Sequence, residues 1–325
     1  MLIFEKYLID NKIDKDGVVN GKMNVDDVRG IKKLDISGYN IISLVGIEVF
    51  TDLENLYCGG NLIKVIDLSK NAALQFLDCS YNIQLTTLDI SKNVTLKNLT
   101  CYNNQISALD VSKNVVLEQL NCSNNLLSTL DVSKNVALQK LFCHNNPLKS
   151  LDISKNIALQ ELYCFEMSLN ALDVSKNTAL NTLYCYNNNL SILDVSKNMA
   201  LQYLFCHFNN NLNSLDISQN IALKSLWCYN NNISALDVSK NIVLGQLYCK
   251  GNKLSILDVS KNIALYDFQC FNNQLTTLDV SKNVALQKLY CEVNKIKTIC
   301  VANITKAMSN SQWYKDKAAT YEVCK

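Results

Sequence analysis

The sequence predicts an α/β repeat solenoid, in which short parallel strands stack along one face and turns or 3₁₀ segments form the other. Three observations predict this class. A 21-residue unit, LQKLFCHNNPLKSLDISKNIA at 138–158, recurs from about residue 53 to residue 290. Twelve cysteines mark its period, spaced by 21 residues or, twice, by 22. Within each unit leucine and cysteine alternate with polar or aromatic residues. A period in the twenties is typical of solenoids, and period-two alternation is typical of a half-buried strand.

Residues 1–30 do not fit the repeat, and we expect them to form an N-terminal cap over the first apolar strand edge. FEKYLIDN predicts a short amphipathic helix with Phe4, Tyr7 and Leu8 on one face, and VDDVRG predicts a second helical piece. The turn around Asp14 and Asp16 is similar to part of a calcium loop. A complete loop needs ligands at its first and twelfth positions. Lysine and methionine stand there, so we expect a polar turn and no metal.

Residues 31–299 predict about 13 repeats of the form LxxLxCxxNxLxxLDVSKNxA, the first with Ile36 in place of cysteine. Because side chains alternate along a strand, Leu141 and Cys143 should point inward, with their neighbours outward. Asn146 and its equivalents should end each strand, since asparagine favours tight turns. The LDVSKN segment should return on the outer side, its aspartate capping a turn.

The ladder cysteines should be buried free thiols. Equivalent residues on adjacent parallel strands lie ~4.8 Å apart and point the same way, whereas a disulfide needs Cβ atoms ~3.8 Å apart and converging. Cys300 and Cys324 lie outside the ladder, and we expect them to form a disulfide that closes a C-terminal cap over 300–325. Such a bridge persists in an oxidising compartment. We expect one structural domain overall.

The unit LxxLxCxxNxLxxLDVSKN resembles the leucine-rich repeat in its short bacterial form, and its cysteine in place of a core leucine resembles the internalin J type, called a cysteine ladder. The beginning and end of the chain are similar to secreted leucine-rich repeat proteins of Bacteroidetes-type bacteria. The resemblance implies a horseshoe or arc with the parallel sheet on its concave face. It also implies protein binding, often at a host or cell surface. We therefore expect an extracellular or cell-surface protein whose signal peptide has been removed. Where Met167 replaces the turn asparagine, we expect a local distortion.

Composition and motifs argue against several classes of function. The net charge of +2 gives no long-range attraction for nucleic acid or acidic lipid. No apolar run reaches the ~18–20 residues of a membrane span. The sequence has neither zinc-ligand spacing nor a phosphate-binding loop, so we expect no cofactor. The two histidines lie three repeats apart and the ladder thiols point inward, so we expect no catalytic site and no enzyme.

The outward strand positions are the candidate site. Residues directly before and after each ladder cysteine are small or polar in the early repeats and aromatic from Phe142 to Tyr248. Interfaces favour such residues because they provide large contact area at low entropy cost. The expected partner-binding residues are Phe142, His144, Tyr163, Phe165, Tyr184, Tyr186, Tyr203, Phe205, His207, Trp227, Tyr229 and Tyr248.

Three interpretations of these residues remain open. The first is a protein partner, such as a host protein, bound on the concave face in adhesion or virulence. The second is a glycan ligand, because aromatic stripes stack on sugar rings. The third is structural, because cross-strand aromatic pairs stabilise a sheet by ~0.2–1 kcal/mol each. A structural cell-surface role and an intracellular effector are alternative functions.

Overall fold

The computed structural model describes residues 2–324. The chain divides into two compact units, Met1–Leu159 and Gln160–Lys325, and each is a parallel-sheet solenoid. Among residues 2–324 no helix is long and apolar enough to cross a membrane. The expected single domain, with caps at 1–30 and 300–325, stays a prediction that the cooperativity of unfolding would test.

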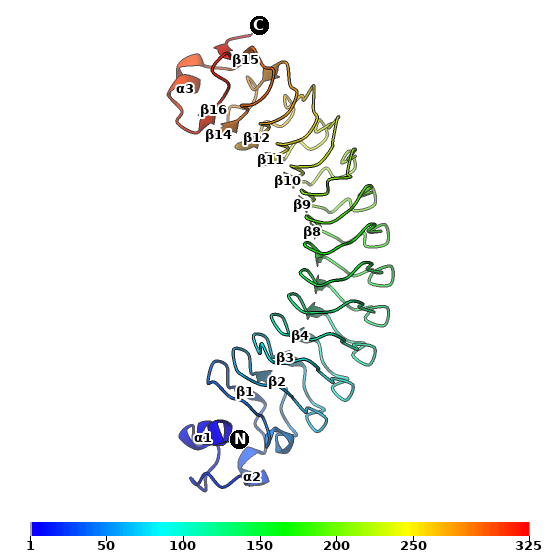
Figure 1. Ribbon diagram of the computed structural model, residues 1–325, viewed down its shortest axis with the longest axis vertical. Coiled ribbons are helices and arrows are strands. Elements are labelled where there is room, and N and C mark those ends of the chain that lie inside the picture. Colours follow the sequence, from blue (N-terminus) through cyan, green and yellow to red (C-terminus); the bar gives the residue numbers. More distant parts are fainter. Residues whose placement is uncertain (1, 325) are drawn as a thin grey trace. The chain divides into compact units, whose positions relative to one another are not determined.

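The first unit begins with two helices and continues as a parallel sheet whose strands follow the order of the chain (Figure 1). Each strand is three residues long with a buried leucine at its centre, and these leucines lie opposite one another in register. The elements are α1 (Leu2–Asp10), α2 (Val25–Val28), β1 (Lys33–Asp35), the 3₁₀ helix η1 (Ile47–Val49), β2 (Asn55–Tyr57), β3 (Phe76–Asp78), β4 (Asn98–Thr100), β5 (Gln119–Asn121) and β6 (Lys140–Phe142).

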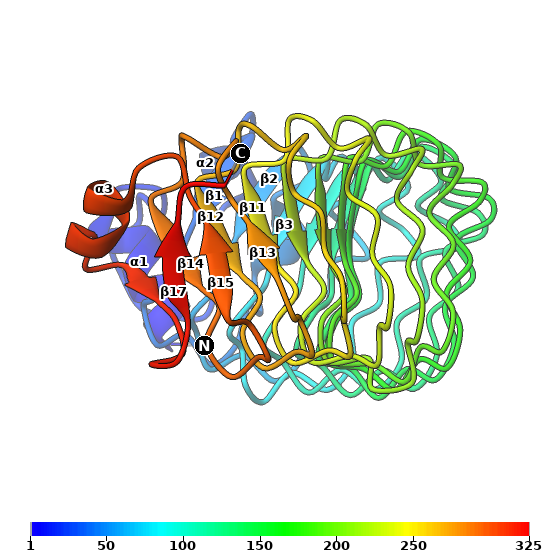
Figure 2. The same cartoon turned by 90° about the horizontal axis from the view of Figure 1, so that it is seen from above.

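The second unit continues the same pattern in a main sheet and adds a three-stranded sheet, β13-β15-β17, at its C-terminal end (Figure 2). The main-sheet strands are β7 (Glu161–Tyr163), β8 (Thr182–Tyr184), β9 (Tyr203–Phe205), β10 (Ser225–Trp227), β11 (Gln246–Tyr248), β12 (Asp267–Gln269), β14 (Lys288–Tyr290) and β16 (Trp313–Tyr314). The small sheet contains β13 (Leu278–Asp279), β15 (Thr298–Cys300) and β17 (Thr320–Glu322), with α3 (Ile304–Ser309) between β15 and β16.

The core of each unit is the stacked leucines and the cysteine ladder. All twelve ladder cysteines are buried and free, as the spacing predicted. Burial raises the pKa of Cys228 to about 12, which keeps the thiol protonated and unreactive. The outer side of the repeat is made of consecutive turns, in which Asp131 Oδ1, for example, accepts a hydrogen bond from Ser133 N–H at 2.8 Å.

Two ladders of asparagine side chains join neighbouring repeats. In the first, Asn125 Nδ2 donates to the carbonyls of Cys101 and Cys122 at 2.9 and 3.1 Å. Sequence reasoning missed the second, formed by the asparagine of SKN. There Asn241 Nδ2 donates to the carbonyls of Ile217 and Asn220 at 3.1 and 2.9 Å, and Asn241 is fully buried. Both ladders supply donors to backbone carbonyls that water cannot reach, which a solenoid requires wherever its chain turns.

Departures from the 21-residue period are absorbed in turns. In the two 22-residue repeats the extra residue lies in a turn closed by Leu85 N–H to Asn82 O at 2.7 Å and by Leu212 N–H to Asn209 O at 2.8 Å, so strand register is kept. The distortion expected at Met167 does not occur. Glu166 keeps the left-handed φ of 52° that Asn187 has one repeat later, and Met167 is buried. An apolar side chain fills the place of the amide.

The two ends of the described chain contain polar contacts as well as apolar ones. In α1, Phe4 and Leu8 are buried, and the carboxylate of Glu5 accepts the N–H groups of Asn20 and Gly21 at 2.8 and 2.6 Å. At the other end, Cys300 and Cys324 form a disulfide with Cα atoms 5.4 Å apart. The C-terminal segment also adds one strand to each sheet of the second unit. β16 pairs with β14 in the main sheet, and β17 pairs with β15 in the small sheet.

Candidate functional site

The outward positions of the strands form a sheet face in each unit. Phe142 and His144 belong to the first unit, at the end of β6 and two residues beyond it. The earlier strands of that unit present mainly small or polar groups there, such as Asp78, Thr100 and Asn121. The other ten expected residues lie on the sheet face of the second unit, which therefore contains most of the candidate site.

The residues directly before each cysteine stack as one column, here called the strand column: Tyr163, Tyr184, Phe205, Trp227 and Tyr248. Their ring centroids follow one another at 4.4, 4.2, 4.2 and 4.8 Å, with interplanar angles of 6–20°. In-register parallel strands impose this spacing, because side chains at one position repeat every ~4.8 Å.

The residues directly after each cysteine form a second column, here called the turn column: Phe165, Tyr186, His207, Tyr229, Lys250 and Phe271. Its first four rings stack at 4.3, 4.3 and 4.1 Å. Lys250 continues the column as a cation, with Nζ 4.8 Å from the ring centre of Tyr229 and 5.1 Å from that of Phe271. The two columns together are called the aromatic face below.

Stacking determines which parts of the rings a ligand can reach. The flat faces of consecutive rings cover one another, so the ring edges and the tyrosine hydroxyls are what face outward. His207 points to the sheet face but is only 5% exposed, because Tyr186 and Tyr229 enclose it. Its burial lowers the pKa of His207 to about 4. Tyr203, at the start of β9, is more open at 38%. The sequence indicated the face but not this mutual covering.

Phe208 completes the aromatic face in a strained conformation. It has a left-handed φ of 54°, is 42% exposed, and packs edge-on against His207 and Tyr229. Asparagine occupies the equivalent position in half of the cysteine repeats, for example Asn187 and Asn230, where it tolerates this φ. An aromatic residue costs stability there, which is a pattern found at functional sites.

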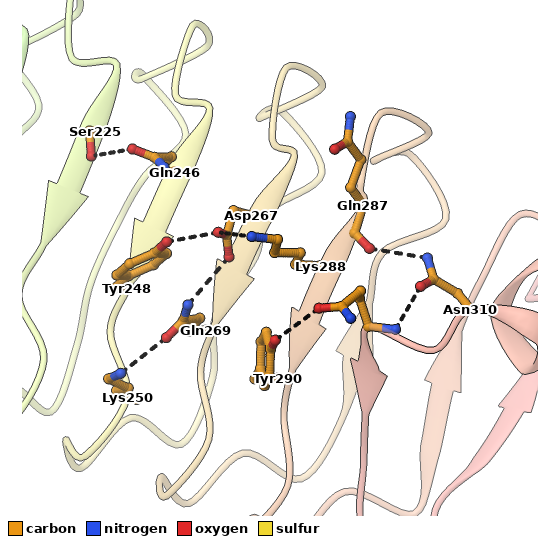
Figure 3. Close-up of polar contacts among 11 residues, drawn as sticks. Ser225, Gln246, Tyr248, Lys250, Asp267, Gln269, Gln287, Lys288, Tyr290 and Asn310 are labelled. Atoms are coloured by element: carbon orange, nitrogen blue, oxygen red, sulfur yellow. Dashed lines mark hydrogen bonds and ion pairs between the residues drawn. The ribbon is translucent and has the colours of Figure 1, made fainter.

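A polar cluster borders the aromatic face on β11, β12 and β14 (Figure 3). Its centre is Asp267, whose side chain is only 5% exposed. Asp267 Oδ2 accepts from the Tyr248 hydroxyl at 2.7 Å and lies 3.8 Å from Lys288 Nζ. Gln269 joins this cluster to the turn column, since its Oε1 accepts from Lys250 Nζ at 3.0 Å.

The two histidines that directly follow ladder cysteines are shifted towards their neutral form. Within residues 2–324, no group of three or more histidine, cysteine, aspartate or glutamate side chains could hold a metal ion. Burial lowers the pKa of His144, like that of His207, to about 4. Neither histidine is therefore poised to titrate near neutral pH.

Comparison with known proteins agrees with the geometry. No protein-family model matches the chain, and no curated protein matches it. Among solved structures, the functional domain of InlJ from Listeria monocytogenes, which includes a cysteine ladder, is 30% identical. The match covers 90% of this chain and 74% of that one, with a TM-score of 0.76.

Two further neighbours show the fold alone. The internalin InlF from Listeria monocytogenes is 21% identical over 99% of this chain and 96% of that one, with a TM-score of 0.70. The plant peptide hormone receptor RGFR1, solved in complex with RGF2, is 20% identical over 90% of this chain and 50% of that one, with a TM-score of 0.67. The fold is thus shared with internalins and with a receptor that holds a ligand.

Proposed function

Because the chain belongs to the cysteine-ladder leucine-rich repeat proteins, the family of internalin J, we propose that it is a non-enzymatic scaffold that binds another protein through the aromatic face of its second unit. The observation that supports this most is the pair of stacked columns, nine rings on five consecutive strands with Tyr203 and Phe208 beside them. A solenoid needs no aromatic residues at these positions to fold, since Asp78, Thr100 and Asn121 hold the same strand position in the first unit.

The size and chemistry of the face fit a protein partner. A standard interface buries ~800 Å² on each side and is rich in tyrosine, tryptophan and phenylalanine. Rigid stacked rings lose little entropy on binding. A glycan ligand is less well supported, because sugar rings stack on open aromatic faces and the faces here are covered by their neighbours. Phe142 and His144 lie in the first unit, and their part in binding stays a separate prediction for that unit.

We also propose that the protein acts at a cell surface or outside the cell, in adhesion or host interaction. The disulfide Cys300–Cys324 supports this, because such bridges persist in oxidising compartments and are rare in the cytosol. An intracellular effector would keep both thiols reduced. Mass spectrometry of the protein from its native source, alkylated before reduction, would separate the two.

The binding proposal is tested by a double variant, Trp227→Ala with Tyr184→Ala. These changes remove two rings of the strand column, and each lost cross-strand pair costs only ~0.2–1 kcal/mol of stability. The fold should therefore survive, as circular dichroism would verify. Capture of a partner identified by mass spectrometry from a cell-surface extract should be lost.

The matched control is Ile242→Ala with Ile263→Ala, which removes two apolar side chains that are 58% and 62% exposed on the turns away from the sheet. This control should capture the partner as well as the wild type. Equal capture by the Trp227 variant would assign the rings a structural role, and loss of capture only in the control would move the site to the turns.

A further inference from the structure

Lys250 interrupts an otherwise aromatic column. Rings precede it in four repeats of the turn column, and Phe271 follows it in the next. A ring at position 250 would continue the stack, because the rings of Tyr229 and Phe271 already lie about one strand spacing away on either side. The chain instead places an ammonium group between the rings of Tyr229 and Phe271, where cation–π attraction offsets part of the cost of its burial. Burial lowers the pKa of Lys250, and the neighbouring Asp267 opposes that shift. A half-buried charge is costly unless it is paired.

The pairing of this charge is incomplete. An ammonium group has three N–H donors. Gln269 Oε1 is its one hydrogen-bond acceptor among residues 2–324, at 3.0 Å. The nearby carboxylate of Asp267 is engaged by the Tyr248 hydroxyl and by the Gln269 amide at 3.4 Å (Figure 3). Gln269 thus fixes the position of Nζ while leaving donors unused.

We propose that Lys250 is the anchor for a carboxylate of the partner, so that the aromatic face binds an acidic stretch of polypeptide. This inference rests on the proposed function and names the chemistry of its partner. A carboxylate is the acceptor that gains most from an ammonium, through a charge-assisted hydrogen bond. The ring edges of Tyr229 and Tyr248 beside it would contact apolar residues on either side of the acid.

The surroundings favour a single negative charge over a dianion such as a phosphate. The buried negative charge of Asp267 borders the site. The nearby cation Lys288 is directed to Asp267, because its Nζ lies 3.8 Å from that carboxylate. A dianion would meet one free cation and one nearby anion. An aspartate or glutamate side chain meets the same cation at a lower electrostatic cost, because repulsion grows with the charge of the ligand.

The test uses a phage-displayed library of random dodecapeptides, panned on the intact protein. Enriched peptides should share an acidic residue flanked by apolar ones. Their affinities are then measured by fluorescence anisotropy for wild type, Lys250→Met and the matched control Lys253→Met. Methionine keeps the packing between the rings, because its sulfur contacts aromatic groups favourably. Lys253 is exposed and lies beyond the turn, so its replacement changes the net charge equally.

Lys250→Met should weaken peptide binding by about 10- to 100-fold, as expected for a hydrogen bond to a charged group. Lys253→Met should leave the affinity unchanged. When the acidic residue of the peptide is replaced by its amide, Lys250→Met should cause no further loss, because the two changes remove the same interaction. Peptides that bind Lys250→Met as tightly as wild type, or that share no acidic residue, would overturn the anchor.

The outcomes separate this inference from the proposed function. Peptides that need Trp227 but ignore Lys250 would overturn the anchor alone. Peptides that ignore both, or a library that yields no binder, would overturn the protein-binding face and the anchor together. An oligogalacturonide, a glycan that carries carboxylates, is tested in parallel. If it binds wild type more tightly than Lys250→Met and no peptide binds, the carboxylate that Lys250 holds belongs to a glycan and the proposal is contradicted.

Discussion

Two strained turns in the second unit allow the stability that the chain loses by placing Phe208 in a left-handed conformation to be measured. Phe208 and Val293 occupy the same position of the repeat, with left-handed φ values of 54° and 56°. The equivalent Asn272 has a φ of 53°. A left-handed conformation costs a non-glycine residue ~1–2 kcal/mol, and asparagine tolerates it best. Each turn therefore lowers the stability of the chain unless other contacts compensate.

Replacing each residue by asparagine should give different results. Val293 is 60% exposed, so Val293→Asn should raise the free energy of unfolding by about 1 kcal/mol through relief of strain. Phe208→Asn should give the same relief, but it removes edge-on contacts with His207 and Tyr229 at 5.6 and 5.3 Å. Each of the two pairs contributes ~0.5–1.5 kcal/mol, so their loss should outweigh the relief, and Phe208→Asn should lower the free energy of unfolding by up to about 2 kcal/mol.

Urea denaturation followed by circular dichroism measures both free energies. Partner affinity should fall for Phe208→Asn and stay constant for Val293→Asn, because Phe208 lies on the aromatic face. If Phe208→Asn stabilises the protein as much as Val293→Asn and binds equally well, then neither the ring contacts nor the functional explanation of the strain is correct. A loss of stability in both variants would refute the assignment of strain itself.

Three other predictions concern the ladders and the buried histidine. Native protein should resist thiol reagents, and unfolding without reductant should expose twelve thiols, the ladder cysteines alone, because Cys300 and Cys324 are bonded; fourteen would contradict the disulfide. Asn241→Ala should cost about 2–3 kcal/mol in urea denaturation, since it strips donors from two buried carbonyls, whereas the exposed Asn189→Ala should cost almost nothing. Burial lowers the pKa of His207 from 6.5 to about 4, so the unfolded state binds the extra proton between these values. Its contribution to stability is then complete above about pH 6.5 and falls as the pH drops towards 4. His207→Phe should reduce the slope of the urea midpoint against pH over this range, and an unchanged slope would show that His207 is not enclosed by its neighbours.

Much of the fold could be predicted because the same sequence pattern recurs in every repeat. One spacing between cysteines determined the period, and alternation around residues such as Leu226 and Cys228 assigned inside and outside along each strand. Parallel register follows, since every unit runs in the same direction. The two ends of the chain depart from the repeat, and their role as caps stays a prediction. The sheet strand that Trp313 and Tyr314 add was not predicted, because its pairing depends on tertiary contacts.

The site was predictable in position but not in chemistry. The sequence placed the rings on one face, yet exposure depends on how rings of adjacent repeats cover one another, so the burial of His207 could not be deduced. The second asparagine ladder was missed because an asparagine in SKN is also typical of an exposed turn. The strain at Phe208 had a signal that could have found it, namely an aromatic residue where half of the cysteine repeats have asparagine.

The most direct measurement of the central claim is photo-crosslinking from a p-benzoylphenylalanine placed at Tyr186, in the middle of the turn column, with the same group at Ile242 on the outer turns as control. The aromatic-face account predicts that light joins the partner to the protein from position 186 and that position 242 gives no adduct. Crosslinks from position 242 without any from position 186 would contradict it.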